Sequence, residues 1–206
     1  MFFIFFVITA YILGSIPTAV WVGRAFYQID VREHGSKNAG ATNTFRVLGK
    51  KPGIFVLAVD IVKGILATSF PLFFSTLFAS PETLINVQLL SALAAVLGHV
   101  FPLFANFKGG KGVATSLGVI IGIHPPAAVI CLGVFILVFG IFNYVSLGAI
   151  IAAATFPLVI EFLFKNDFVW LRVFSICLSL AVIITHHKNI KRLLSGNENK
   201  MNLFKK

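Results

Sequence analysis

Long apolar runs alternate with short polar segments along most of this chain. A helix of about 20 apolar residues crosses the hydrocarbon core of a bilayer. The pattern therefore predicts an all-α integral membrane protein, a single transmembrane domain over residues 1–206 built as one bundle of about seven helices. The expected helices cover residues 2–22, 52–78, 84–104, 113–123, a run from Pro126 to 142, 147–164 and 168–185.

The run 113–123 is too short to cross a bilayer by itself. With a rise of 1.5 Å per residue it spans roughly 17 Å, whereas the hydrocarbon core is about 30 Å thick. It is either a short or re-entrant helix packed inside protein, or a helix lengthened by the polar loop before it. The number of complete spans is then seven, or five or six if the short segments do not cross.

The composition indicates that lipid surrounds much of the surface. Hydrophobic residues make up 58% of the 206 positions and the mean hydropathy is +0.95, whereas a soluble domain is about 45–50% apolar. Cys131 and Cys177 lie in apolar runs, so we expect packing residues rather than a disulfide framework or a metal site. The first eleven residues hold no Lys or Arg, which indicates a retained helix rather than a cleaved signal.

The basic residues are distributed unevenly. The net charge is +10, and fourteen of the 17 Lys and Arg residues lie in the polar segments 24–51, 105–112 and 186–206. With seven spans these segments share one side of the membrane, which the positive-inside rule makes cytoplasmic. The N-terminus is then outside and the C-terminus cytoplasmic. The charge therefore reflects membrane orientation and a surface for anions, and we expect no nucleic acid as a partner.

Three polar motifs lie in these basic segments. In motif one, residues 34–46, small residues alternate with hydroxyls and amides and end at Arg46. Backbone N–H groups in such a stretch can approach an anion closely, and the Arg46 guanidinium matches the geometry of a phosphate. An ordinary Gly- and Asn-rich turn with a helix cap is the alternative.

Motif two, residues 98–115, contains the run Lys108-Gly109-Gly110-Lys111-Gly112 directly before a helix. Glycines admit a phosphate to the backbone, a helix N-terminus attracts negative charge, and the two lysines can neutralise it. The spacing is not that of a Walker loop. The lysines could instead be positive-inside anchors, although that explanation gives the glycines less reason to be there.

Motif three, residues 186–198, follows the last apolar run. If the last helix continues, His186 and Asn189 lie on one helical face, three residues apart. An interfacial basic tail is the alternative. Glu198 could orient a base, but we expect a solvated charge in the tail.

Asp60 and Lys63 are charges inside the apolar run 52–78, three residues apart. Charges within a membrane segment are costly and mark function by default. A structural ion pair is the preferred interpretation, because such a pair requires no substrate.

These residues resemble the PlsY family of bacterial membrane acyltransferases, the acyl-phosphate:glycerol-3-phosphate acyltransferases. The likeness covers nearly the whole chain. It lies in Gly14-Ser15-Ile16-Pro17, in residues 36–43 with Arg46, in Asp60 with Lys63-Gly64, in Gly98-His99 with Phe101-Pro102 and 108–112, and in His186 with Asn189-Ile190 and Arg192-Leu193. The chain departs from the family pattern at Lys37, where Gly is common, at Thr185, where Arg is frequent, and at Asn197, where Thr is usual.

The resemblance implies seven transmembrane helices with the N-terminus outside, in the bacterial cytoplasmic (inner) membrane, and an active site on the cytoplasmic side. It implies transfer of a fatty acyl group from acyl phosphate to the 1-hydroxyl of sn-glycerol 3-phosphate, the first acylation step of phospholipid synthesis. The products would be 1-acyl-glycerol 3-phosphate (lysophosphatidate) and inorganic phosphate. The resemblance also implies membrane lipid as surroundings, a functional link to the enzyme that makes acyl phosphate, and no metal, acyl-CoA or prosthetic group as cofactor. In the family, substrate phosphate rather than a dedicated protein base is described as taking the proton.

The chemistry of this reaction fits the motifs. Acyl phosphate is an activated mixed anhydride, and a site that holds two mutually repelling phosphates requires clustered cations. In this interpretation phosphate is neutralised by Arg46, Lys108 and Lys111. The glycerol phosphate or its attacking hydroxyl is positioned by His99, His186 and Asn189. The candidate catalytic residues are Ser36, Arg46, His99, Lys108, Lys111, His186 and Asn189. The candidate substrate-binding residues are Asn38, Gly40, Thr42, Asn43, Gly109, Gly110, Gly112 and Thr115.

A transporter or channel for small phosphorylated anions is the alternative from another functional class. It would predict cations along a pore and paired inverted repeats. Among the apolar runs, Lys63 is nearly the only cation near the membrane midplane, and no repeat is visible. The sequence also lacks the His-x4-Asp pattern of another acyltransferase class and the Gly-x-Ser-x-Gly elbow of serine hydrolases.

Overall fold

The computed structural model describes residues 2–201; Met1 and residues 202–206, which include the tail lysines Lys205 and Lys206, lie outside the described part. All regular elements in the described part are helices, as the apolar runs predict. The chain forms two compact units, Met1–His124 and Pro125–Lys206. The assignment of a single domain over residues 1–206 stays a prediction.

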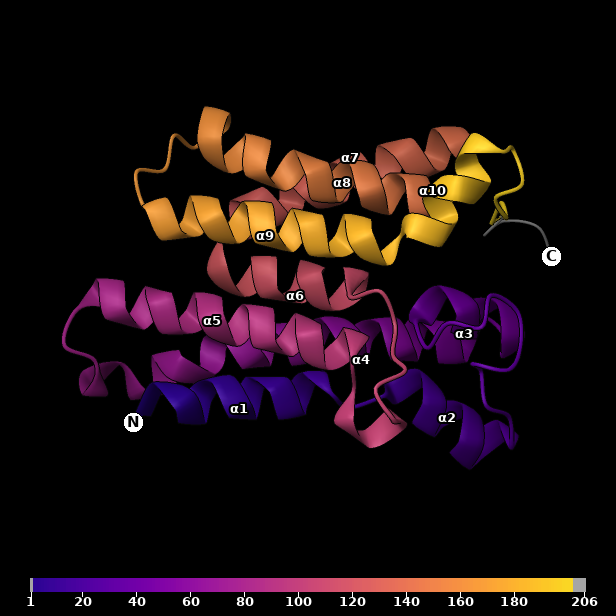
Figure 1. Cartoon of the computed structure of the whole chain (residues 1–206), viewed down its shortest axis with the longest axis horizontal. Coiled ribbons are helices and arrows are strands. Elements are labelled where there is room, and N and C mark those ends of the chain that lie inside the picture. The colour runs from indigo at the N-terminus through magenta and orange to yellow at the C-terminus, as the bar shows by residue number, and fades with distance from the viewer. Residues whose placement is uncertain (1, 202–206) are drawn as a thin grey trace. The chain divides into compact units, whose positions relative to one another are not determined.

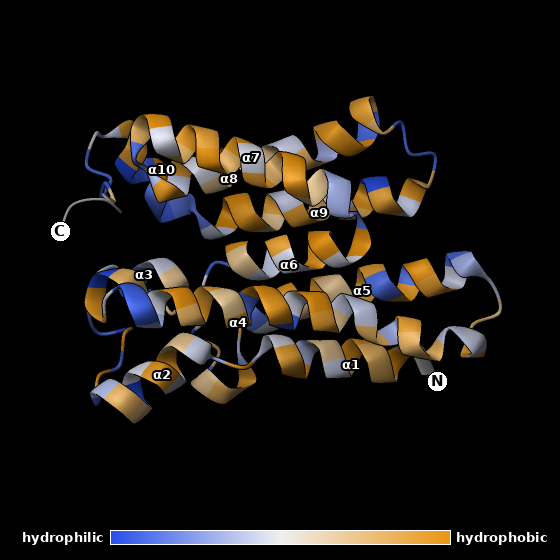
Figure 2. Cartoon of the chain, turned by 180° about the vertical axis from the view of Figure 1, so that it is seen from behind, coloured by the Kyte–Doolittle hydropathy of each residue, from blue (hydrophilic) through white to orange (hydrophobic). Residues whose placement is uncertain are grey.

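The first unit is a group of helices packed side by side, with α2 and α3 at its polar end (Figure 1 and Figure 2). Helix α1 packs against α5, and α4 packs against α6 and also contacts α1, α3 and α5. Figure 1 shows these long helices side by side, with α2 and α3 at one end of the unit. Its helices are α1 (Phe2–Gly14), α2 (Thr18–Tyr27), α3 (Ala41–Val47), α4 (Lys50–Ser69), the 3-10 helix η1 (Phe70–Leu77), α5 (Pro81–Val100), η2 (Leu103–Ala105) and α6 (Val113–Ile123).

The first predicted helix, 2–22, is broken in the structure. Helix α1 ends at Gly14 and α2 begins at Thr18. Pro17 has no N–H to donate and disfavours a helical conformation at Ile16, which explains the break. After it, α2 runs beyond the predicted end to Tyr27, where Gln28 adopts a left-handed conformation. Pro71, within the predicted helix 52–78, lies where α4 passes into η1.

Close glycine contacts join the helices of the first unit. A Cβ atom added to Gly118 of α6 would collide with the Ile61 carbonyl of α4, and one added to Gly64 of α4 would lie 2.5 Å from the Thr115 carbonyl of α6. Small residues of this kind let helix backbones approach in a membrane. The short helix α6 is therefore packed inside protein, and Gly112, at φ 81°, starts it without any extension by the polar loop.

The second unit contains three long helices and a short terminal one. Helix α8 contacts both α7 and α9, and α10 contacts both α8 and α9. The π-helix η3 follows Pro157, which cannot donate to the regular ladder. The elements are α7 (Pro125–Phe142), α8 (Val145–Leu158), η3 (Val159–Leu163), α9 (Val169–Thr185) and α10 (His187–Leu194).

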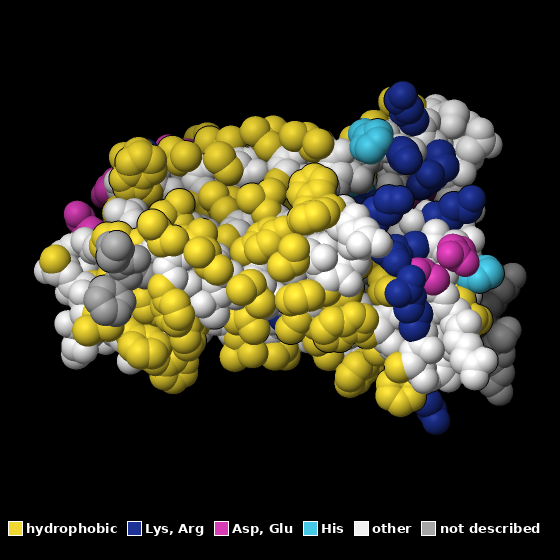
Figure 3. All heavy atoms as spheres, turned by 60° about the horizontal axis from the view of Figure 1, so that its bottom comes forward, with side chains coloured by type: hydrophobic (Ala, Val, Ile, Leu, Met, Phe, Trp, Pro, Cys, Tyr) yellow, Lys and Arg dark blue, Asp and Glu magenta, His cyan; other side chains and the backbone are white. Residues whose placement is uncertain are grey.

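Five helices of the described residues are long and apolar enough to cross a membrane, and α9 with α10 makes a sixth if the bent pair is one span. Large apolar side chains face outward on them, such as Phe73, which is 81% exposed. Figure 2 shows this apolar covering along the helices, with hydrophilic residues concentrated around α3 and around α10. On the face that Figure 3 brings forward, hydrophobic side chains cover most of the surface and basic side chains gather toward one side.

Candidate active site

The loop of motif one is organised around a buried amide. Asn43, in the first turn of α3, is 1% exposed. Its Nδ2 donates to the carbonyls of Val31 (2.6 Å) and His34 (3.1 Å), and its Oδ1 accepts from the Ser36 N–H (2.8 Å) and Oγ (3.0 Å). Because the amide is fully engaged inside the protein, we assign Asn43 to holding the loop and Ser36, rather than to direct contact with a phosphate.

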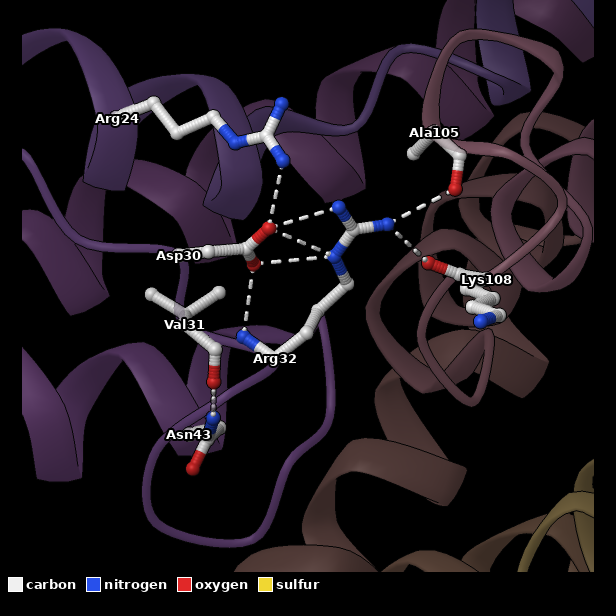
Figure 4. Close-up of polar contacts among 7 residues, drawn as sticks. All are labelled: Arg24, Asp30, Val31, Arg32, Asn43, Ala105 and Lys108. Atoms are coloured by element: carbon white, nitrogen blue, oxygen red, sulfur yellow. Dashed lines mark hydrogen bonds and ion pairs between the residues drawn. The ribbon is translucent and has the colours of Figure 1, made fainter.

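A cluster of charged residues lies at the start of the same loop (Figure 4). The Asp30 carboxylate accepts from Arg32 through Nε (3.0 Å) and Nη2 (2.8 Å), and from Nη2 of Arg24 (2.9 Å). The hydrogen bond from the Arg32 side chain holds the pKa of Asp30 well below its usual value, against a smaller opposing effect of burial. The hydrogen bond from Asp30 in turn raises the pKa of Arg32. Both groups are therefore charged over the whole ordinary pH range.

The turn of motif two folds back on the end of α5. Gly109 N–H donates to the Val100 carbonyl (3.2 Å) and Gly110 N–H to the His99 carbonyl (3.1 Å). A Cβ atom on Gly109 would collide with the His99 carbonyl, and one on Gly110 with Nε2 of the His99 ring. The two glycines are thus required by close contact with His99. The turn leads into the N-terminus of α6, which has no side-chain cap.

His99 also belongs to a buried charged cluster. Lys63 Nζ lies 2.9 Å from Asp60 Oδ1, and His99 Nδ1 lies 3.7 Å from the same oxygen. Thr18 donates to this oxygen as well (3.3 Å), and Lys63 donates to the Ile16 carbonyl (3.0 Å), which the break between α1 and α2 leaves without a helical partner. The Asp60–Lys63 pair therefore connects α4 to the helix break and to the histidine beneath the motif-two turn.

The remaining candidates of motifs one and two differ in exposure. Ser36, Arg46 and Lys108 are exposed, and Lys111 is half-buried. Asn38, Gly40 and Thr42 are half-buried, and Gly112 is buried at the start of α6. Thr115 is completely buried, and its hydroxyl makes no hydrogen bond within the described residues. The exposed cations and the uncapped N-terminus of α6 are the groups that an anion from solvent can reach.

Motif three lies in the second unit, where the chain bends at the end of α9. The chain bends by 62° between α9 and α10. His186, at the bend, is 2% exposed, and its Nδ1 lies 2.7 Å from the Val182 carbonyl. Asn189 is in α10 and is also buried. The last long helix ends at Thr185, as predicted, and the condition of a straight continuation is not met, because His186 leaves the helical conformation with a ψ of 7°.

Glu198 is not the solvated charge that the sequence predicted. Its side chain is 5% exposed. Oε1 accepts from Asn189 (2.6 Å) and Ser146 (2.8 Å), and Oε2 accepts from Arg192 (2.6 Å). Burial raises the pKa of Glu198, but these hydrogen bonds, led by that of Arg192, outweigh burial and lower it. The segment after α10 is thus folded back onto the start of α8.

In the first unit, Arg32 connects the loop before motif one to motif two, because its Nη1 donates to the carbonyls of Ala105 (2.8 Å) and Lys108 (3.4 Å). Motif three lies in the second unit, so its share in one common site stays a prediction. Sequence reasoning missed Asp30 and Ser146 and counted Arg32 only as a positive charge. The sequence did contain a signal for Asp30, because Asp30 and Glu33 are the only acidic residues in the basic segment 24–51.

Comparisons with known proteins identify the family to which the chain is similar. The family model described as glycerol-3-phosphate acyltransferase matches residues 4–196. A glycerol-3-phosphate acyltransferase of Fusobacterium nucleatum subsp. nucleatum is 44% identical over 200 residues, which cover 97% of this chain and 98% of the relative. One of Chlorobaculum tepidum is 42% identical over 229 aligned positions, covering 99% of this chain and 98% of the relative.

Two solved structures are also similar. The crystal structure of PlsY, an integral membrane glycerol 3-phosphate acyltransferase, in its glycerol 3-phosphate form covers 100% of both chains with a TM-score of 0.87 and 36% identity. The lysophosphatidic acid form of PlsY matches with a TM-score of 0.84 and 37% identity, over 98% of this chain and 96% of the other. This chain is an integral membrane protein and belongs to the glycerol-3-phosphate acyltransferase family.

Proposed function

We propose that this protein transfers a fatty acyl group from acyl phosphate to the 1-hydroxyl of sn-glycerol 3-phosphate. The products are 1-acyl-glycerol 3-phosphate (lysophosphatidate) and inorganic phosphate, and the reaction is the first acylation step of phospholipid synthesis. The observation that supports it best is the link that Arg32 makes from the loop before motif one to the Lys108 carbonyl of the motif-two turn, which leads into the uncapped start of α6. Membership of the acyltransferase family gives the acceptor.

The reaction requires no redox partner. The hydroxyl oxygen forms a bond to the acyl carbon, the bond from that carbon to the phosphate oxygen breaks, and phosphate leaves with the electron pair. The proton of the hydroxyl ends on the released phosphate, so the step is balanced within its two substrates. Arg46, Lys108 and Lys111 would reduce the repulsion between two phosphates and stabilise the charge that develops on the leaving group.

The other residues proposed for the site would position the substrates rather than neutralise their charge. Ser36, Asn38, Thr42 and the 109–112 backbone would hold phosphate, and His99 with the motif-three residues His186 and Asn189 would place the attacking hydroxyl. Gly40 and Thr115 complete the substrate-binding set. This assignment requires all three motifs to share one cytoplasmic site within a single domain, with seven spans and the N-terminus outside. We also propose that the protein lies in the bacterial inner membrane and is functionally linked to the enzyme that makes acyl phosphate.

The test is a reconstitution with chosen substrates. Purified protein in detergent receives acyl phosphate and glycerol 3-phosphate, and released phosphate and lysophosphatidate are measured together. We expect the two products in equal amounts, and no turnover when acyl-CoA replaces acyl phosphate, because the site is proposed to act on a phosphate leaving group. Equal rates with both donors would contradict the proposal.

A further inference from the structure

The two loops that carry motifs one and two are joined by one side chain. Arg32 lies in the loop before motif one, and its Nη1 donates to the carbonyls of Ala105 and Lys108 at 2.8 and 3.4 Å. These acceptors lie more than 70 positions further along the chain, on either side of the turn that starts the Lys108–Gly112 run. Figure 4 shows the guanidinium between the Asp30 carboxylate on one side and these two carbonyls on the other.

Asp30 fixes the direction in which Arg32 points. Its Oδ1 accepts from both the backbone N–H (3.0 Å) and Nε (3.0 Å) of Arg32, and its Oδ2 accepts from Nη2 (2.8 Å). The two side chains are only 10% and 17% exposed. A guanidinium held on one edge by a carboxylate can present its other edge to the two carbonyls in a single orientation.

The same loop is fixed at its other end by Asn43. This side chain donates to the Val31 carbonyl, next to Arg32, and accepts from the Ser36 N–H and hydroxyl. A continuous chain of hydrogen bonds and one peptide link therefore runs from the Lys108 carbonyl through Arg32 and Asn43 to Ser36. A shift of Arg32 would change the separation of Ser36 and Lys108, the ends of this chain.

We propose that Asp30 and Arg32 form a positioning clamp that sets the separation between Ser36 and Lys108 across the candidate phosphate site. Neither side chain needs to touch a substrate for this purpose, since the Arg32 donors are occupied by Asp30 and by the backbone of the motif-two loop. The inference rests on the proposed function for its kinetic consequence. Its structural consequence, the ordering of residues 103–112 by Arg32, can be measured without any substrate.

Arg24 provides a matched control for this clamp. Its Nη2 donates at 2.9 Å to Oδ2 of Asp30, the oxygen that also accepts from Arg32 Nη2. The Arg24 side chain is 62% exposed, and within the described residues it bonds to Asp30 alone. Arg24→Ala thus removes an equal charge from the same carboxylate and leaves the bonds to Ala105 and Lys108 intact. Arg32→Lys keeps the charge but cannot hold the carboxylate with two donors and reach both carbonyls.

The experiment combines hydrogen exchange with steady-state kinetics on full-length protein in detergent. For Arg32→Lys and Arg32→Ala we expect faster hydrogen exchange confined to residues 103–112 and an unchanged thermal midpoint. We also expect kcat/KM for a phosphorylated substrate to fall at least about tenfold, which is the effect of losing one charge-assisted bond. Asp30→Asn should show the same pattern more weakly, and Arg24→Ala should stay within about twofold of wild type.

The outcomes separate the clamp from the proposed function. Unchanged exchange at 103–112 in Arg32→Lys, or faster exchange throughout the first unit, would overturn the positioning role. Local loosening with unchanged kinetic constants would overturn its relevance to the site. If Arg32→Ala does not fold, Arg32→Lys decides between these outcomes. If the wild-type protein itself lacks acyl transfer, the proposed function fails, and the exchange result still decides whether Arg32 orders the loop.

Discussion

Asp60 is the residue for which a structural role can be tested against a catalytic one. Its carboxylate lies 2.9 Å from Lys63 and 3.7 Å from His99, and all three side chains are buried. Asp60→Asn leaves a buried ammonium without its counter-charge, which costs about 3–5 kcal/mol when one partner of a buried pair is removed. We therefore expect the yield of folded protein to fall more than the activity per folded molecule. Abundant, folded but inactive protein would instead place Asp60 in the catalytic group.

Arg46 and Lys111 test the proposed anion site residue by residue. We expect Arg46→Lys and Lys111→Ala each to lose at least tenfold in kcat/KM for one phosphorylated substrate, because a charge-assisted bond is worth roughly 1.5–3 kcal/mol. Lys51→Ala is the control, since Lys51 is exposed at the start of α4. Variants that behave like this control, with membrane insertion unchanged, would reduce these cations to topology signals.

The polar residues were predictable as a group, but their individual purposes were not. Gly109 and Gly110 stand out in sequence, and the structure gives the reason, a close contact with His99. Asn43 also stands out, but whether its amide faces solvent or the loop depends on the fold of residues 31–36. Asp30 lies outside the three motifs, and Glu198 is the last residue of motif three. The partners that they contact, such as Arg32 and Ser146, are set by the fold.

At the scale of single helices, Gly118 is a sharp test of how α6 is held. A side chain there collides with the Ile61 carbonyl of α4, whereas one added to Gly133 of α7 meets no atom within 4 Å. Overpacking of this kind costs about 1–3 kcal/mol or more. Gly118→Leu should lower the thermal midpoint in detergent, and Gly133→Leu should not. Equal midpoints for the two variants would show that α4 and α6 are not in close contact.

The attachment of α10 through Glu198 should depend on pH. The pKa of Glu198 in the folded protein lies below the ordinary value of 4.5, so its stabilising effect is fully present above that value and disappears as the pH falls through the folded-state pKa. We expect Glu198→Gln to have a lower thermal midpoint than wild type at pH 5–7. The gap should close below pH 4.5, and a gap independent of pH would contradict the ionised contacts.

Helix positions were predictable from hydrophobicity, and helix breaks were predictable only where proline causes them. Pro17 and Pro71 lie at interruptions that follow from the missing N–H. The bend at His186 has no such signal in the sequence. After it, the Met201 N–H donates to the carbonyl of Asn143 (2.9 Å), in the turn between α7 and α8. Sequence also gives no sign that α3 forms inside a polar segment.

At the scale of the whole molecule, topology is the decisive measurement. Single cysteines at Lys37, Phe104 and Lys188 should all react with an impermeant reagent only from the cytoplasmic side, since the proposed site requires all three motifs there. Phe104 is preferable to Gly110, where a side chain would collide with the His99 ring. Cys131 and Cys177 must first be replaced, because Cys177 is exposed. Labelling of any one position from outside would break the single-site proposal.

The break between α1 and α2 has a consequence for biosynthesis. The Ile16 carbonyl is bonded by Lys63, which is 47 positions later in the chain. At ribosomal rates of about 5–20 residues per second, Lys63 is made roughly 2–10 s after Ile16. Until then the Thr18 N–H (3.0 Å) is the one other donor to this carbonyl within the described residues, and the carbonyl lacks a regular helical bond. Incompletely satisfied backbone is costly in lipid, so we expect the nascent first helix to remain beside the translocon or in the headgroup region during this interval. Lys63 itself can enter the bilayer already paired with Asp60, one turn earlier in the same helix, and its arrival allows the first helix to settle.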